Sequence, residues 1–221
     1  MTSIISKLGQ LISRRALLSE RCRRNEETLA KIYDINGPLC LHLGSGGNLK
    51  PGWINVDGDQ YLNKNLKVDL CWDLAKPLPL KPDSVDYAYS EHFIEHLTVA
   101  EGAAFFSNIY KILRPGGVLR TATPTLENVI KTYLSPAWVT QEELDIWGLS
   151  QVKTRCELTN LCFTAWGHHY LYDAEELSRR LKEAGFRDVI LCEWNKSEHP
   201  VLNNIESHGP EYDSLIMEAV K

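Results

Sequence analysis

The sequence predicts an α/β fold in which helices cover both faces of a mostly parallel sheet, with a helical extension before the first strand. Three observations support this prediction: apolar runs alternate with helix-like segments, a glycine-rich turn follows the first run, and polar residues follow the next ones. A chain of 221 residues with 43% hydrophobic residues suits one globular domain with an appendage. We expect the extension over residues 1–36 and the main domain over 37–221.

The extension is expected to contain an amphipathic helix over residues 4–33, because its apolar residues recur at helical spacing. Asn36, Gly37 and Pro38 end this segment. Arginines lie between the apolar positions, so the helix suits packing on the body, a homodimer contact or a peripheral contact with an anionic membrane surface. No apolar run approaches the roughly 20 residues that a transmembrane span needs.

Charge and cysteine content narrow the classes of function. Residues 1–24 carry a net charge of +5, which leaves −10 on the rest of a chain whose total is −5. Such an acidic body disfavours nucleic acid as a partner, because phosphate binding needs a basic surface. The six cysteines form no C-x-x-C pair and several lie in apolar runs, which predicts a reduced, cytoplasmic protein.

Strand-like and helix-like runs alternate along the main domain. The expected strands cover residues 39–43, 53–56, 67–72, 85–90, 117–122, 189–194 and 214–219. The expected helices cover residues 98–113, 124–134, 140–149 and 174–184. The segment 135–165 interrupts the alternation, so it is our candidate for a lid or an acceptor-binding insertion. The two late strands indicate that the sheet ends in a hairpin-like pair.

Local signals indicate where several of these elements end. Thr98 and Glu101 have the spacing of a capping box, so a helix should begin directly after Thr98. The segment Arg114-Pro115-Gly116-Gly117 should end this helix and turn into a strand. Gly185 should end the helix at 174–184.

The glycine-rich turn at Gly44–Gly47 and the carboxylate of Asp57 are the strongest functional signal. A short apolar run enters the turn, and the next apolar run ends at Asp57. This order is typical of a parallel strand, a loop that a ligand approaches closely and an acid that binds a ribose. The sequence therefore indicates a nucleotide-like cofactor.

Polar residues also follow the third and fourth runs. Asp73 and Leu74 follow the third run, and the segment from Ser90 to His96 follows the fourth. The carboxyl ends of parallel strands meet at one edge of an open sheet, where ligands bind. We therefore expect all four groups to converge on one cleft.

These residues resemble a class I S-adenosylmethionine-dependent methyltransferase of the methyltransferase type 11 kind, which implies a Rossmann-like fold and S-adenosylmethionine as cofactor. The resemblance covers about residues 39–123 and rests on His42-Leu43-Gly44-Ser45-Gly46-Gly47, Val56-Asp57, Trp72-Asp73-Leu74, Ser84-Val85-Asp86 and Leu113-Arg114-Pro115-Gly116-Gly117. The chain departs from the usual pattern between Gly44 and Asp57, where Lys50-Pro51-Gly52 leaves room for one helical turn at most. We interpret this segment as a compact first crossover.

The resemblance implies a cofactor site formed by Gly44, Ser45, Gly46, Asp57, Asp73, Leu74 and Ser90. The glycines would let the backbone approach the methionine part of the cofactor, where a Cβ would clash. Asp57 would accept hydrogen bonds from both ribose hydroxyls. Asp73 would accept one from the adenine amino group, with the Leu74 backbone on the ring edge.

The segment from His92 to His96 faces the transferable methyl group in such enzymes. We name His92, Glu95 and His96 as catalytic candidates, with one histidine as the general base that takes a hydroxyl proton. No metal ligands are assigned, although Glu95 keeps one position of an acidic pair that holds a divalent cation in some relatives. The same residues spell H-x-x-E-H, a pattern of zinc hydrolases, which is a remote alternative.

The predicted function is methyl transfer from S-adenosylmethionine to a small-molecule or sugar acceptor, including glycans, at a hydroxyl oxygen. Residues expected to line the acceptor pocket are His168, His169, Tyr170, Trp138, Trp147 and Trp166. The alternative from another class is a catalytically silent partner subunit that binds S-adenosylmethionine.

Overall fold

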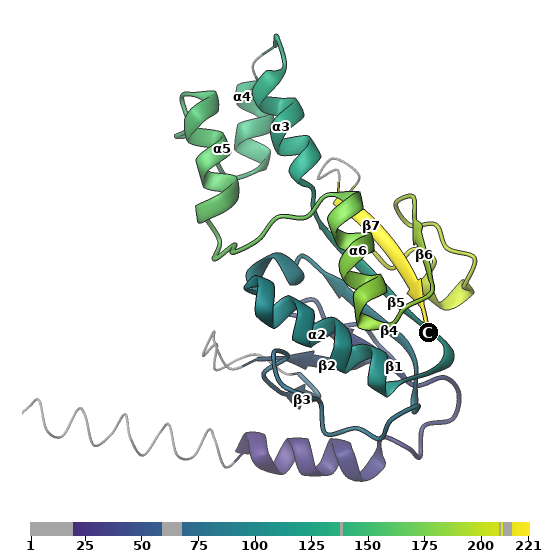
Figure 1. Cartoon of the computed structure of the whole chain (residues 1–221). Coiled ribbons are helices and arrows are strands. Elements are labelled where there is room, and N and C mark those ends of the chain that lie inside the picture. The colour runs from purple at the N-terminus through teal and green to yellow at the C-terminus, as the bar shows by residue number, and fades with distance from the viewer. Residues whose placement is uncertain (1–19, 59–67, 138, 208, 210–213) are drawn as a thin grey trace, which may run out of the picture.

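The computed structural model describes residues 20–58, 68–137, 139–207, 209 and 214–221. Its centre is a seven-stranded sheet with the order β3-β2-β1-β4-β5-β7-β6 (Figure 1). The strands are β1 (Cys40–Leu43), β2 (Ile54–Asp57), β3 (Leu70–Cys71), β4 (Val85–Glu91), β5 (Leu113–Pro124), β6 (Asp188–Leu191) and β7 (Ser214–Val220). β7 runs antiparallel to β5 and β6, and the other pairs are parallel. The predicted mostly parallel α/β fold is confirmed.

One face of the sheet packs against α2 (Val99–Ile112) and α6 (Ala174–Ala184) (Figure 1). Phe105 of α2 is fully buried in this layer, where it removes a large apolar surface from water. The predicted capping box is present at Thr98, so α2 begins where the sequence indicated. α6 ends at Gly185, whose φ of +114° is readily adopted only by glycine.

The opposite face of the sheet is covered in part by the connection between β6 and β7. Leu202, in the 3-10 helix η2 (Pro200–Leu202), and Ile205 pack there against Tyr89 of β4 and Val118 of β5. The short β1–β2 crossover contains no helix, so this connection occupies surface that a crossover helix would otherwise cover.

A buried ion-pair network holds this connection on the sheet. Arg120 of β5 is fully buried, and its Nε and Nη1 donate to Glu206 Oε1 and Glu218 Oε1, both at 2.6 Å. The same guanidinium donates to the carbonyl oxygens of Lys196 at 3.0 Å and Glu193 at 3.2 Å. Arg120 therefore joins β5, β7 and the connection through charge-assisted hydrogen bonds.

The helix at residues 20–31 lies against the β3 edge of the sheet. The Asn25 side chain accepts a hydrogen bond from the Cys71 N–H at 2.8 Å and donates to the Cys71 carbonyl at 2.9 Å. Thr28 Oγ1 donates to the Asp69 carbonyl at 2.7 Å. These bonds satisfy backbone groups that an edge strand would otherwise expose. Residues 4–19 of the expected amphipathic helix lie outside the described residues. Among the described residues, no helix is long and apolar enough to cross a membrane.

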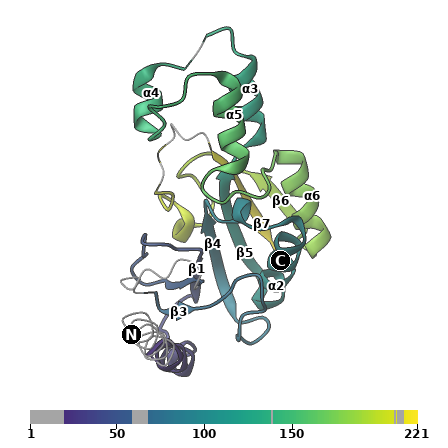
Figure 2. The same cartoon turned by 90° about the vertical axis from the view of Figure 1, so that its left-hand side faces the viewer.

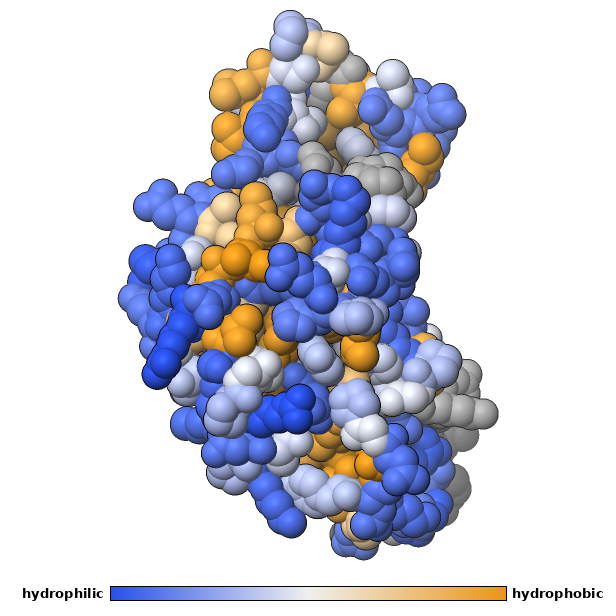
Figure 3. All heavy atoms as spheres, turned by 90° about the vertical axis from the view of Figure 1, so that its right-hand side faces the viewer, coloured by the Kyte–Doolittle hydropathy of each residue, from blue (hydrophilic) through white to orange (hydrophobic). Residues whose placement is uncertain are grey.

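A helical cap stands beyond the end of β5 (Figures 1 and 2). It consists of α3 (Leu126–Leu134), α4 (Gln141–Ile146) and α5 (Arg155–Thr164). The cap has a small core of its own, formed by Leu144, Leu149, Val152 and Leu158. The space-filling view shows it as a lobe above the body, with apolar atoms in small groups among polar ones (Figure 3).

Several elements differ from the sequence prediction. α5 was expected to be part of an irregular insertion, although Thr154 caps it by accepting a hydrogen bond from the Glu157 N–H at 3.1 Å. β5 begins four residues earlier than expected because Leu113 pairs with Val85 across a register shift. β6 ends at Leu191, since the following residues turn beneath the sheet toward Arg120.

Candidate active site

The glycine-rich turn after β1 is held by the end of β2. The N–H groups of Gly44 and Ser45 both donate to the Val56 carbonyl, at 2.9 and 3.2 Å, and the Gly46 N–H donates to Asp57 Oδ2 at 2.5 Å. Gly44 has a φ of +68°, and a Cβ there would lie 2.3 Å from the ring of Phe93. Only glycine therefore fits at this position without displacing Phe93.

Asp57 lies at the end of β2, beside the turn. Its Oδ1 accepts a hydrogen bond from the Gly58 N–H at 2.6 Å, in addition to the bond from Gly46 to Oδ2. Burial raises the pKa of the Asp57 carboxyl above its ordinary value, while these two bonds and the charge of His96 oppose that shift. A carboxylate offers about four acceptor sites, so two remain for a ligand hydroxyl pair.

The other predicted cofactor residues lie at neighbouring strand ends. Asp73 is half exposed, accepts a hydrogen bond from the Ala75 N–H at 3.1 Å and pairs with Lys76 at 3.0 Å. Leu74 is buried in the core. The Ser90 hydroxyl is fully buried and bonds to Thr121 Oγ1 at 2.8 Å, so this side chain serves the sheet.

The turn fits a polar ligand that lies against its backbone. Ser45 Oγ is buried, and within the described part of the chain it has no hydrogen-bond partner. A Cβ placed at Gly46 or Gly47 would meet no described atom within 4 Å. A polar atom that needs a partner and open space over the loop are both features that S-adenosylmethionine would use.

The histidine-rich segment after β4 forms a tight loop above the sheet. His92 has a left-handed φ of +49°, and the 3-10 helix η1 (Ile94–His96) follows it. The His92 Nε2 lies 3.0 Å from Ser214 Oγ, and its Nδ1 lies 3.7 Å from Glu95 Oε1. His92 is thus held between the first residue of β7 and Glu95.

Glu95 is fully buried beneath this loop. Thr123 Oγ1 donates to its Oε2 at 3.0 Å, and its backbone carbonyl accepts from the His169 and Tyr170 N–H groups at 2.7 and 3.1 Å. His96 Nε2 lies 3.9 Å from Glu95 Oε1. The segment that returns from the cap is therefore fastened to the loop at residues 92–96.

His96 and His168 lie face to edge, with ring centroids 5.0 Å apart. Burial lowers the pKa of His96, and the neighbouring His168 lowers it further, so its neutral form predominates at neutral pH. The His168 Nδ1 lies 2.9 Å from the Cys162 carbonyl, which makes Nδ1 the donor in this contact. One ligand atom from each of Glu95, His96 and His168 lies within 4.8 Å of the others.

A cavity of about 820 Å³ lies between the cap and the loop at residues 92–96. The loop contributes His92, Glu95 and His96, and the cap contributes polar and apolar side chains from all three of its helices. The lining residues from the cap helices include Asn128, Lys131 and Leu158, and the others include Thr125, Trp147, Trp166 and His168. The volume suits a small organic molecule.

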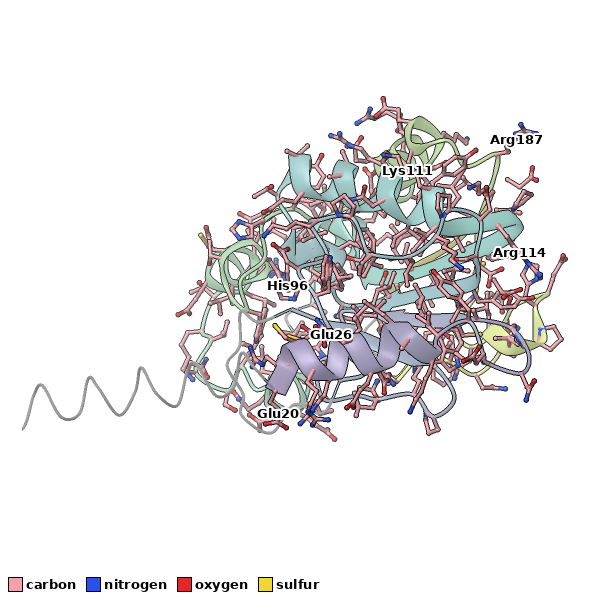
Figure 4. All side chains as sticks on the ribbon, turned by 90° about the horizontal axis from the view of Figure 1, so that it is seen from below. Glu20, Glu26, His96, Lys111, Arg114 and Arg187 are labelled. Carbon is pink, nitrogen blue, oxygen red and sulfur yellow. The ribbon has the colours of Figure 1, made fainter. Side chains whose placement is uncertain are left out.

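Figure 4 places His96 at the opposite end of the sheet from Arg114 and Arg187.

The model of a known family, described as a methyltransferase domain, matches residues 14–191 of the chain. The chain belongs to the methyltransferase domain family. Its identification as a class I S-adenosylmethionine-dependent methyltransferase, an enzyme with S-adenosylmethionine as cofactor, is thereby confirmed. No curated protein matches the sequence.

Solved structures of methyltransferases are similar to this chain at low sequence identity. A methyltransferase from Archaeoglobus fulgidus is 18% identical over 94% of both chains, with a TM-score of 0.51. A possible histamine N-methyltransferase from Thermotoga maritima is 16% identical over 100% of both chains, with a TM-score of 0.49. Phosphoethanolamine N-methyltransferase 2 from Haemonchus contortus, in complex with S-adenosyl-L-methionine, is 15% identical, with a TM-score of 0.44. The match to it covers 90% of this chain and 52% of that one, so this chain spans about half the length of that relative.

The structure adds residues to the candidate site that sequence reasoning missed. His168 was expected only in the wall of the acceptor pocket, yet it lies beside His96, and Thr123 and Ser214 contact Glu95 and His92. Thr123 directly follows the strand expected at residues 117–122, which was a usable signal, and it lies within β5 in the structure, whereas Ser214 is 122 residues from His92 and had no such signal. Trp147, Trp166 and His168 line the cavity, His169 and Tyr170 are not among its lining residues, and Trp138 lies outside the described residues.

Proposed function

We propose that this methyltransferase transfers the methyl group of S-adenosylmethionine to a hydroxyl oxygen of a small-molecule or sugar acceptor, including glycans. The observation that carries this proposal is the cavity of about 820 Å³, which is lined by His92, Glu95, His96 and His168. A cavity beside histidines and a carboxylate offers both room for an acceptor and groups that move a proton.

The proposed cofactor site is formed by Gly44, Ser45, Gly46, Asp57, Asp73, Leu74 and Ser90. When bound, S-adenosylmethionine supplies an electrophilic methyl group. The open backbone at Gly46 and the buried hydroxyl of Ser45 support contact with the methionine part, and Asp57 would hold the ribose hydroxyls. Ser90 would contribute through its backbone, because its hydroxyl bonds to Thr121.

In the proposed mechanism, His96 takes the proton from the acceptor hydroxyl as the oxygen attacks. Its neutral state at pH 7 and its place in the cavity wall support this role. Glu95 stabilises the resulting imidazolium, and His92, held by Ser214, orients Glu95. Most of the acceleration comes from alignment of the reactants, while a base adds about 10²–10⁴-fold.

The test compares His96→Gln and His92→Gln with the matched control His199→Gln, whose ring lies on the far side of the sheet against Tyr87. Methyl transfer from labelled S-adenosylmethionine is measured on a panel of phenols, sugars and hydroxy acids. We expect His96→Gln to lower kcat by at least 100-fold with an unchanged affinity for S-adenosylhomocysteine in calorimetry. Full activity of His96→Gln would refute its role as base.

The same assay separates the silent-subunit alternative. A wild-type chain that binds S-adenosylhomocysteine but methylates no acceptor on the panel would favour the partner-subunit alternative. Absent binding of S-adenosylhomocysteine would refute both proposals.

A divalent cation is the second candidate, because Glu95, His96 and His168 bring three ligand atoms within 4.8 Å. Two imidazoles and one carboxylate suit zinc, manganese or iron(II). The bonds from Thr123 to Glu95 and from His168 to the Cys162 carbonyl have the character of contacts that orient metal ligands. A bound cation would polarise the acceptor oxygen. Loss of activity after chelation, with recovery on adding one metal, would support the cation over His96 as base.

The zinc-hydrolase alternative has less support in the geometry. The backbone of His92 has a left-handed conformation, and the residues after it form only the three-residue 3-10 helix η1. Peptide hydrolysis by the zinc-loaded chain is the result that would favour it.

For location we propose the cytoplasm, supported by six free cysteines. The helix at residues 20–31 is our proposed contact for a homodimer or a membrane surface.

A further inference from the structure

The crossover between β1 and β2 contains no helix, yet it must hold the glycine-rich turn at Gly44–Gly47 in place. Three successive N–H groups of that turn, at Gly44, Ser45 and Gly46, bond to the last two residues of β2. The position of β2 therefore determines where the turn lies. Something other than a helix has to fix the residues that lead into β2.

Asn55, in the middle of β2, occupies the point where these residues meet. Its side chain is 5% exposed and its Oδ1 accepts a hydrogen bond from the Lys50 N–H at 2.7 Å. Its Nδ2 lies within hydrogen-bond distance of the Lys50 carbonyl at 3.2 Å and the Trp53 carbonyl at 3.1 Å. One buried amide thus binds both ends of the turn at residues 50–53.

Asn55 also ties this turn to the residue that leads into β3. Asp69 Oδ2 accepts hydrogen bonds from Asn55 Nδ2 at 2.9 Å and from the Asn55 N–H at 2.8 Å. The Asp69 N–H in turn donates to the Asn55 carbonyl at 3.0 Å. His42 of β1 lies 3.3 Å from Asn55 Oδ1, so the amide contacts three neighbouring strands or their approaches.

We propose that Asn55 and Asp69 form a positioning pair for S-adenosylmethionine binding, which replaces the missing crossover helix. The pair does not touch the proposed cofactor site. It holds the turn at residues 50–53, and through β2 it sets the distance between Asp57 and the glycine-rich turn. The inference rests on the proposed placement of the cofactor at Gly44–Gly46.

The test measures the affinity of the full-length chain for S-adenosylhomocysteine by calorimetry, with melting temperature and kcat at saturating cofactor as further readouts. Asn55→Asp keeps the side-chain size but removes the Nδ2 donors and places a carboxylate against Asp69. We expect at least a tenfold weaker affinity and a matching rise in the KM for S-adenosylmethionine, with kcat within threefold of the wild type. Asn48→Asp is the matched control: Asn48 is exposed in the same loop, and we expect its affinity within twofold of the wild type.

The double variant Asn55→Asp with Asp69→Asn removes the repulsion between the two carboxylates. We expect it to recover at least threefold of the lost affinity and to remain weaker than the wild type. If Asn55→Asp does not fold, the double variant decides alone, and an affinity threefold or more below the wild type supports the pair. A folded Asn55→Asp variant that binds less than tenfold more weakly than the wild type overturns the inference. Where Asn55→Asp does not fold, a double variant within threefold of the wild type overturns it. Failure of the wild type to bind S-adenosylhomocysteine would instead refute the proposed function.

Discussion

Replacing Arg120 by methionine should destabilise the protein more than any surface substitution. Arg120, Glu206 and Glu218 have side chains exposed by 2% or less, and the two ion pairs have N–O distances of 2.6 Å. Arg120→Met leaves two buried carboxylates without their cation, and breaking such a pair costs about 3–5 kcal/mol in the free energy of unfolding. The loss also frees the carbonyl groups of Lys196 and Glu193, which hold the β6–β7 connection on the sheet.

The assay is urea unfolding followed by circular dichroism at pH 7.5. With a slope of about 3 kcal/mol per molar urea, the midpoint should fall by about 1–1.7 M. Arg179→Met is the matched control, because Arg179 pairs with Glu176 and Glu183 on the exposed face of α6 and should leave the midpoint nearly unchanged. Equal shifts for the two variants would refute the reasoning. Adding Glu206→Gln and Glu218→Gln to Arg120→Met should recover part of the loss.

Three further predictions concern the strand ends around the site. Burial lowers the pKa of His42 to about 4, below its unfolded value, so the contribution of His42 to stability is complete above pH 6.5 and falls by about 3 kcal/mol as the pH drops to 4. In His42→Phe the urea midpoint should therefore change less between pH 6.5 and pH 4 than in the wild type. An equal change in both proteins would contradict this. Gly44→Ala should cost about 1–3 kcal/mol in thermal unfolding, because its Cβ meets Phe93, and an unaltered melting temperature would show that Phe93 moves freely. Asp57→Ala should weaken S-adenosylhomocysteine binding at least tenfold by calorimetry; equal affinity would mean that Asp57 only organises its own turn.

Much of the fold was predictable because its signals are local. Thr98 and Glu101 mark the start of α2 through bonds between neighbouring residues, and Gly185 marks the end of α6 through a backbone angle that other residues resist. α5 carried the same kind of signal at Thr154, although its weak apolar pattern concealed it. The cover on the second face of the sheet was not predictable, since Arg120 meets Glu206 across 86 positions.

The candidate site likewise contains residues that the sequence groups and partners that only the fold brings to them. Gly44, Asp57 and the segment from His92 to His96 follow strands, so the rule that parallel strand ends meet at one edge was enough to group them. The partners of these residues come from the cap and from β7, as His168 and Ser214 do. No spacing in the sequence relates them to the loop at residues 92–96.

The sequence by itself determined the class of the protein: its strand and helix order, its glycine-rich turn and its carboxylates identify a methyltransferase that uses S-adenosylmethionine. These features are short and local, so they can be read before the chain is folded. Only the tertiary structure decided how the cap and the loop at residues 92–96 enclose a cavity and how His96, His168 and Glu95 come together. Those contacts depend on packing between distant segments, which determines side-chain distances that no local pattern records.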